Sequence, residues 1–269
     1  MTTTSGPLAV VTGASSGIGL ALAKQFAEHG YDLIVTAEDE GIDSAARQVG
    51  SSGANVRAVR ADLRTREGVE GLYAEVRDSP IDALALNAGV GVSGDFTRDV
   101  PLEDELNLLE LNVVSTVHLA KRLLPDMVRR GMGRVLVTSS VAATAPGPFE
   151  ATYAASKSFL QSFGQALRSE LRGTGVSVTV LMPGVTDTHF FERAGMQDTK
   201  LGATADKDDP DDVARQGFEA LMRGDDHVIA GSVRDKAMAA SSRLLSEPAR
   251  AEMHRKRTEP GSADPAAEP

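Results

Sequence analysis

The 269-residue sequence contains no cysteine and no tryptophan. Without cysteine, disulfide bonds and thiolate chemistry are excluded. No segment reaches the roughly 18 consecutive apolar residues of a membrane-spanning helix, and residues 1–7 lack the basic region of a secretion signal. We therefore expect a cytoplasmic protein without a membrane partner.

Basic residues are also in the minority. The 28 Lys and Arg against 38 Asp and Glu give a net charge of -10 and a pI near 5.0. This excess of negative charge argues against a nucleic-acid partner and against an anionic membrane surface. A composition that is 41% hydrophobic and 25% charged suits a globular protein with a substantial core.

Short apolar runs alternate with segments of helical periodicity. We expect strands over residues 8–12, 32–37, 55–59, 81–86, 134–138 and 176–182. We expect helices over residues 20–28, 43–49, 67–78, 102–130 (in one or two pieces), 152–171 and 210–222. Strands without polar alternation, separated by helices, indicate a parallel sheet covered on both faces.

The predicted fold class is therefore α/β, with a doubly wound, mostly parallel sheet of the Rossmann type. A length of 269 residues is normal for one such domain. We assign residues 1–258 to this single domain. Residues 259–269 are rich in Pro, Ala and acidic residues, which predicts a disordered tail.

A glycine-rich turn at residues 13–19 joins the first strand to the first helix. This order is the context that a dinucleotide site requires. Gly13 permits the tight turn, Gly17 lets the backbone approach a pyrophosphate, and Gly19 allows close helix–strand packing. The pyrophosphate would lie on the N–H groups at the positive end of the helix. The predicted contacts in this turn are Gly13, Ser15, Ser16, Gly17, Ile18 and Gly19.

Tyr153 and Lys157 stand four residues apart, downstream of Ser140. Tyrosine has an unperturbed pKa of about 10 and is a poor base at neutral pH, but a neighbouring cation favours its phenolate. Positions i and i+4 share a helix face, so Lys157 can lie beside Tyr153. Ser140 could polarise a substrate oxygen at the same point. Such a pair arises by chance in many helices, and the glycine turn is what makes it informative.

Together these residues resemble the short-chain dehydrogenase/reductase superfamily in its single-domain form. The resemblance covers about residues 8–231. Its motifs are Thr12-Gly13-x-x-x-Gly17-x-Gly19, Asn87-Ala88-Gly89, Asn112, Ser140, Tyr153-x-x-x-Lys157 and Pro183-Gly184, in the family's order. The resemblance implies an enzyme that transfers a hydride between NAD(P) and a secondary alcohol or ketone. The alternative is a catalytically inactive regulator or scaffold on the same fold.

The resemblance also implies residue roles. Tyr153 would be the general acid or base, and Ser140, or its neighbour Ser139, would bond the substrate oxygen. Lys157 would lower the tyrosine pKa and hold the nicotinamide ribose. Asn112 would keep a water that links Lys157 to solvent. The remaining implied cofactor contacts are Asp62 and Leu63 at the adenine, Asn87, Ala88 and Gly89 at its ribose, and Pro183, Gly184, Val185, Thr186 and Thr188 at the nicotinamide and pyrophosphate.

The end of the second predicted strand bears on the choice between NAD and NADP. Ala37 stands at the family's usual aspartate position, and Glu38 stands where NADP users often have arginine. A carboxylate there bonds the ribose 2′-hydroxyl and repels a 2′-phosphate. NAD is therefore favoured, and NADP remains the alternative, with Arg60 as the cation that would swing across to the phosphate.

Residues 188–205 correspond to the family's variable substrate lid. Phe190, Phe191 and Met196 would give the lid an apolar inner face, and Phe149 would add to it from the opposite rim. These side chains suit a hydrophobic carbonyl compound. We expect the lid to become ordered when ligands bind.

Two further expectations concern assembly and metals. The predicted helix around Tyr153 carries more apolar residues than one buried stripe needs, which favours a homodimer or homotetramer. The five histidines lack ligand spacing. The acidic run at residues 206–212 is better explained as a helix cap around Asp209 and Pro210. We therefore predict no metal site.

Overall fold

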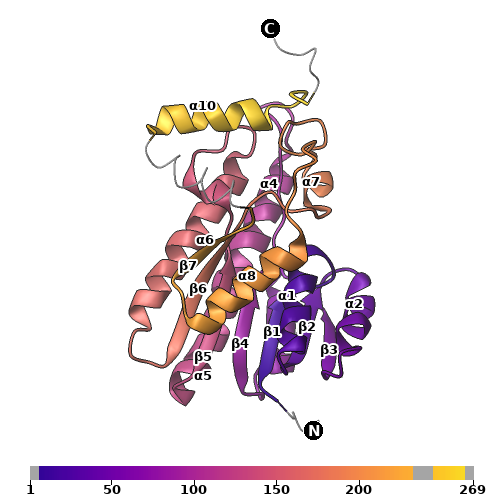
Figure 1. Cartoon of the computed structure of the whole chain (residues 1–269), viewed down its shortest axis with the longest axis vertical. Coiled ribbons are helices and arrows are strands. Elements are labelled where there is room, and N and C mark those ends of the chain that lie inside the picture. Colours follow the sequence, from indigo (N-terminus) through magenta and orange to yellow (C-terminus); the bar gives the residue numbers. More distant parts are fainter. Residues whose placement is uncertain (1–5, 233–244, 264–269) are drawn as a thin grey trace.

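The computed structural model describes residues 6–232 and 245–263. Within these residues, seven parallel strands form one sheet in the order β3-β2-β1-β4-β5-β6-β7 (Figure 1). The strands are β1 (Leu8–Thr12), β2 (Asp32–Ala37), β3 (Val56–Arg60), β4 (Ile81–Leu86), β5 (Gly133–Thr138), β6 (Val176–Pro183) and β7 (His227–Ala230). The predicted fold class is confirmed, while β7 was not predicted.

Helices cover both faces of the sheet. Successive strand side chains point to opposite faces, so Val11 packs in the core under α1, α2 and α8, while Val10 packs in the core under α3, α5 and α6. The helices are α1 (Gly17–Glu28), α2 (Gly41–Gly50), α3 (Arg66–Val76), α4 (Leu102–Leu109), α5 (Ser115–Arg130), α6 (Ala151–Glu170), α7 (Phe190–Arg193), α8 (Pro210–Arg223) and α10 (Glu247–Thr258). None of the helices in the described ranges is long and apolar enough to cross a membrane.

The helix predicted over residues 102–130 is divided by one turn of π-helix, η1 (Glu110–Val114), between α4 and α5. This turn holds Asn112, which is fully buried. A π-turn inserts one extra residue into a helix and is frequent at functional sites. Elsewhere, α8 begins at Pro210 as predicted, and Asp209 caps it by accepting a hydrogen bond from the Asp211 N–H (2.8 Å).

The C-terminal helix α10 lies across the carboxyl end of the sheet, close to the lid helix α7 (Figure 1). Its far end is held by Thr258, whose hydroxyl donates to the Pro148 carbonyl (2.8 Å). The prediction of a disordered tail needs correction over residues 259–263. These form a turn in which the Gly261 N–H donates to Asp198 Oδ2 (2.9 Å) and the Ala263 N–H donates to the Asp198 carbonyl (2.9 Å). Residues 264–269 lie outside the described residues.

Candidate active site

The carboxyl ends of the strands surround a cavity of about 280 Å³. The strand order reverses between β1 and β4, and open α/β sheets bind ligands in the crevice at such a reversal. Every site residue predicted from the sequence lines this cavity except Asn112.

The glycine turn between β1 and α1 has no room for a side chain at its three glycine positions. Gly13 and Gly17 have φ of +67° and +54°, in the left-handed region that favours glycine. A Cβ on Gly19 would lie 2.0 Å from the Gly13 carbonyl oxygen and 2.6 Å from Asn87 Nδ2. On Gly17 it would lie 3.0 Å from Thr188 Cγ2. The turn therefore presents bare backbone at the N-terminus of α1, which fits a dinucleotide pyrophosphate.

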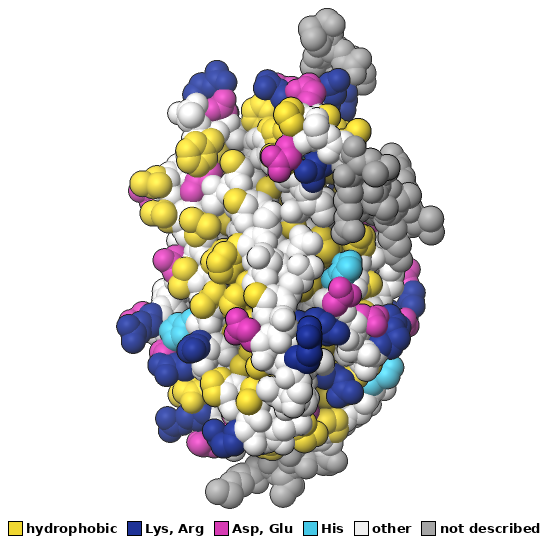
Figure 2. Space-filling view, turned by 90° about the vertical axis from the view of Figure 1, so that its left-hand side faces the viewer, with side chains coloured by type: hydrophobic (Ala, Val, Ile, Leu, Met, Phe, Trp, Pro, Cys, Tyr) yellow, Lys and Arg dark blue, Asp and Glu magenta, His cyan; other side chains and the backbone are white. Residues whose placement is uncertain are grey.

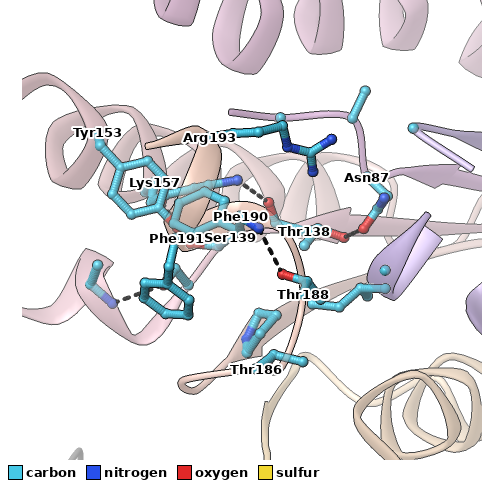
Figure 3. A pocket seen from close by; sticks show the side chains of 18 of the residues that line it. Asn87, Thr138, Ser139, Tyr153, Lys157, Thr186, Thr188, Phe190, Phe191 and Arg193 are labelled. Atoms are coloured by element: carbon cyan, nitrogen blue, oxygen red, sulfur yellow. Dashed lines mark hydrogen bonds between the residues drawn. The ribbon is translucent and has the colours of Figure 1, made fainter. Parts of the chain in front are cut away.

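Asn87 fixes the loop after β4. Its Nδ2 donates to the Thr12 carbonyl (3.1 Å), and its Oδ1 accepts from the Thr138 hydroxyl (3.1 Å; Figure 3). The backbone N–H of Asn87 donates to Thr12 Oγ1 (2.9 Å). One amide side chain thus joins the ends of β1, β4 and β5, and the positions of the cavity's loops depend on it.

Tyr153 and Lys157 both come from α6, and both are buried. Lys157 Nζ lies 5.7 Å from the centroid of the tyrosine ring. It donates to the Thr138 carbonyl (3.2 Å; Figure 3). The ammonium is therefore held between the end of β5 and the phenol.

Of the two candidate serines, Ser140 is the one that interacts with the phenol, and its hydrogen bond to Tyr153 favours the phenolate. It caps the short 3₁₀ turn η2 (Val141–Thr144), accepting from the Ala142 N–H (3.1 Å). Ser139 instead donates to the Lys157 carbonyl (2.7 Å) and so ties β5 to α6.

Burial dominates the titration of both catalytic candidates. It raises the pKa of Tyr153 well above its ordinary value, and the charge of Glu150 raises it further, while Ser140 lowers it. Burial lowers the pKa of Lys157 to about 8. Instead of the expected lowering, the tyrosine pKa is raised, because burial of the phenolate and the charge of Glu150 outweigh the hydrogen bond with Ser140. At neutral pH the phenol is protonated, which is the form a general acid needs.

Asn112 lies behind the cavity rather than in it. Its Oδ1 accepts from the Val90 N–H (2.9 Å), and its Nδ2 donates to the Val90 carbonyl (3.0 Å) and to Ser156 Oγ (3.1 Å). A Cβ on Gly89 would lie 3.0 Å from Asn112 Oδ1 and 3.2 Å from Lys157 Nζ. The amide thus holds the loop after β4 against α6, immediately behind Lys157.

Glu38 and Asp62 line the cavity and share one cation, Arg64, which sequence reasoning missed. Arg64 pairs with the Glu38 carboxylate and with Asp62 Oδ1 (2.9 Å). Its hydrogen bonds hold the pKa of Asp62 below the usual value. Arg60, the cation named for the NADP alternative, donates to the Glu38 carbonyl (2.8 Å) and pairs with Glu40 (3.2 Å).

One lid side chain packs against the phenol, and a second packs against the first (Figure 3). The Phe190 ring lies 5.2 Å from the Tyr153 ring, and Phe191 packs edge-on against Phe190. Two other expectations are wrong. Met196 is fully buried within the lid, where it packs with Phe191 and Ala194, and does not line the cavity. Phe149 lies in a separate surface hollow, with Arg255 over its ring.

Another part of the cavity wall comes from α10, which the sequence analysis did not identify. Its lining residues Arg250, Met253, His254 and Arg257 have the spacing i, i+3, i+4, i+7 of one helix face. His254 Nε2 lies 3.0 Å from Oε2 of Glu150, a buried residue directly before α6. This spacing was the signal in the sequence that could have revealed the α10 wall. The helix is too polar, however, to be recognised by a periodic pattern of apolar residues.

A dinucleotide turn and a buried tyrosine–lysine pair in one cavity of a doubly wound sheet define a class of nicotinamide-dependent oxidoreductases. The sequence profile described as short chain dehydrogenase matches residues 7–199. The chain belongs to this family, and it is an NAD(P)-dependent oxidoreductase that acts on hydroxyl or ketone groups.

Individual relatives agree with this assignment. The chain is 39% identical over 223 residues to a 1-deoxy-11-beta-hydroxypentalenate dehydrogenase of Streptomyces exfoliatus, which covers 79% of this chain and 78% of that one. The structure of this chain is similar to that of a short-chain dehydrogenase from Sphingobium yanoikuyae in complex with NADPH. The TM-score is 0.78 at 29% identity, and the match covers 89% of this chain and 94% of that one. The structure is also similar to that of a short-chain dehydrogenase from Burkholderia phymatum in complex with NAD (TM-score 0.81, 26% identity, 97% and 99% covered).

Proposed function

We propose that this enzyme interconverts an apolar secondary alcohol and its ketone, with Tyr153 as the acid–base group. The observation that supports this most strongly is the shared cavity. The buried phenol, the Ser140 hydroxyl and the Lys157 ammonium line the same space as the glycine turn. The nicotinamide cofactor, when bound, supplies or accepts the hydride at the substrate carbon.

In this proposal Tyr153 gives its proton to the ketone oxygen during reduction and takes it back during alcohol oxidation. Ser140 bonds the same oxygen. Lys157, when protonated, holds the nicotinamide ribose, and Asn112 keeps open the route by which a water reaches Lys157. The proposed cofactor contacts are those expected from the sequence, all of which line the cavity.

For the cofactor we propose NAD. Glu38 lines the cavity, where its carboxylate would accept from a ribose 2′-hydroxyl. Arg64 is already paired with two carboxylates, and Arg60 is engaged with the Glu38 carbonyl and Glu40. Fluorescence titration should show tighter binding of NADH than of NADPH, with the order reversed in Glu38→Arg. Tighter NADPH binding by the wild type would contradict the proposal and would assign the 2′-phosphate to Arg64.

The test of the catalytic proposal is Tyr153→Phe, assayed by absorbance of the reduced cofactor against a panel of apolar secondary alcohols and ketones. Turnover should fall by about 10²- to 10⁴-fold, while cofactor affinity stays within a few-fold. Tyr73→Phe is the matched control, because Tyr73 lies against Arg122 and does not line the cavity. Activity above half of wild type in Tyr153→Phe would refute the assignment. Cofactor binding by the wild type without turnover of any compound would favour a regulator.

We also propose a homo-oligomer. Several apolar side chains of α4, η1, α5 and α6 are exposed, and Figure 2 shows hydrophobic side chains gathered on the side of the molecule nearest α5 and α6. The exposed apolar residues of these four elements are Leu102, Leu106, Val114, Val117 and Phe159. Burying such side chains against a two-fold partner is favourable. Light scattering at micromolar concentration should give a dimer or tetramer mass, and a monomer mass would end this proposal.

A further inference from the structure

One guanidinium on the α10 wall has incomplete hydrogen bonding. Arg250 Nη1 donates to the Thr144 carbonyl (2.6 Å). Among the described residues, its buried Nε has no hydrogen-bond partner. Nη2 lies 3.9 Å from Glu247 Oε1, beyond hydrogen-bond distance. A buried charged donor without an acceptor is unfavourable, and such groups are rare enough in native proteins to need an explanation.

The geometry of Arg250 suits a carboxylate. Nε and Nη2 form the edge of a guanidinium that donates two parallel hydrogen bonds to the two oxygens of one carboxylate. The third nitrogen, Nη1, is bonded to Thr144 and so holds the plane of the group. Binding would therefore require little further ordering of this side chain.

The surrounding charges also favour an anion. Arg193 from the lid and Arg257 from α10 line the same cavity as Arg250. Of the described carboxylates that line it, three lie on the loops after β2 and β3, and the remaining one, Glu150, has its Oε2 bonded to His254. The charged side chains with which the lid and α10 line the cavity are therefore all basic.

We propose that Arg250 binds a carboxylate of the substrate, so that the substrate is an apolar ketone or secondary alcohol carrying a carboxylate at a distance from the reacting carbon. This rests on the proposed function, because it names the substrate class of the same cavity. The apolar part of the substrate would contact Phe190, Phe191 and Met253, which line the cavity.

Binding can be tested without turnover. Octanoate and octanamide have the same chain and nearly the same shape, differ in charge, and carry no ketone or hydroxyl. Calorimetry on the cofactor-saturated wild type should show about 10- to 100-fold tighter binding of octanoate. Arg250→Gln should abolish this preference. Lys256→Gln removes the same charge from an exposed position on α10 that does not line the cavity. This variant should keep the preference for octanoate.

Two outcomes would overturn the proposal: equal binding of both probes by the wild type, or an unchanged preference in Arg250→Gln. If Arg250→Gln fails to fold, as judged by circular dichroism, Arg250→Lys decides instead. Lysine keeps the charge but has no two-nitrogen edge, so the preference should fall at least several-fold. An unchanged preference in Arg250→Lys would overturn the proposed bidentate contact.

A kinetic comparison separates this inference from the proposed function. With 5-oxodecanoate and its methyl ester, Arg250→Gln should lower kcat/KM for the acid by about 10- to 100-fold and leave the ester within a few-fold. An octanoate preference with no turnover of either compound would support the carboxylate site and contradict the proposed ketone chemistry. Equal losses for acid and ester would show a structural role for Arg250 and overturn the inference.

Discussion

The two ends of the cavity are built from different parts of the chain. The end at β1 and β4 consists of backbone, in a turn where glycines meet carbonyl oxygens and the Asn87 amide joins three strands. The other end consists of side chains from α7 and α10, such as Phe190 and Arg250, facing Tyr153 and Glu150 of the α6 region. A backbone-built end can hardly vary without losing its shape, whereas a wall of side chains can change its chemistry and keep the fold.

The largest effect is expected at the backbone-built end. In Gly19→Ala the new Cβ would lie 2.0 Å from the Gly13 carbonyl oxygen, so the turn must move. Cofactor affinity should fall by more than about 100-fold, and thermal unfolding should shift downward. Gly71→Ala in α3 is the matched control, because no described atom lies within 4 Å of its Cβ. It should bind cofactor normally and be unchanged or slightly more stable. Normal cofactor binding by Gly19→Ala would remove the distinction between the two ends.

The same difference explains what the sequence could predict. The turn at residues 13–19 was predictable because its tight geometry demands glycine at particular local positions. The α10 wall was not, because its contacts join residues about a hundred positions apart: His254 with Glu150, and Arg250 with Thr144. Arg64 was missed for a related reason. Its importance comes from bonding Glu38, and only the parallel pairing of β2 with β3 brings these residues together.

An intermediate effect is expected at Lys157, between the two ends. Burial lowers its pKa to about 8, and the cofactor would bind the protonated amine. Cofactor affinity should therefore be constant below pH 8. It should fall by up to about tenfold per pH unit above pH 8, until the pKa of Lys157 in the complex is reached. Fluorescence titration of reduced cofactor between pH 7 and about 9.5 would measure this. Tyr153→Phe should show the same fall, and a flat profile would contradict cofactor contact through the ammonium.

The smallest effect is expected from Glu150, in the side-chain-built end. Its charge raises the pKa of Tyr153, although less than burial does. His254 bonds its Oε2, and Tyr153, Lys157 and Arg250 line the same cavity. In Glu150→Gln the charge is lost and the amide keeps the shape, so the pKa of Tyr153 should fall.

The pH profiles of both reaction directions should move to lower pH, with opposite effects on activity at a fixed alkaline pH. Alcohol oxidation needs the phenolate, so its rise with pH should begin at lower pH in Glu150→Gln than in the wild type. Ketone reduction needs the phenol, so its loss at high pH should also move to lower pH.

Cofactor affinity at pH 7 should not change, because Glu150 lies on the substrate side. Glu192→Gln in the exposed part of the lid removes an equal charge from a position that does not line the cavity, and should leave both profiles unchanged. Identical pH profiles for Glu150→Gln and the wild type would show that burial alone sets the tyrosine pKa, and that the α10 wall shapes binding without tuning the proton transfer.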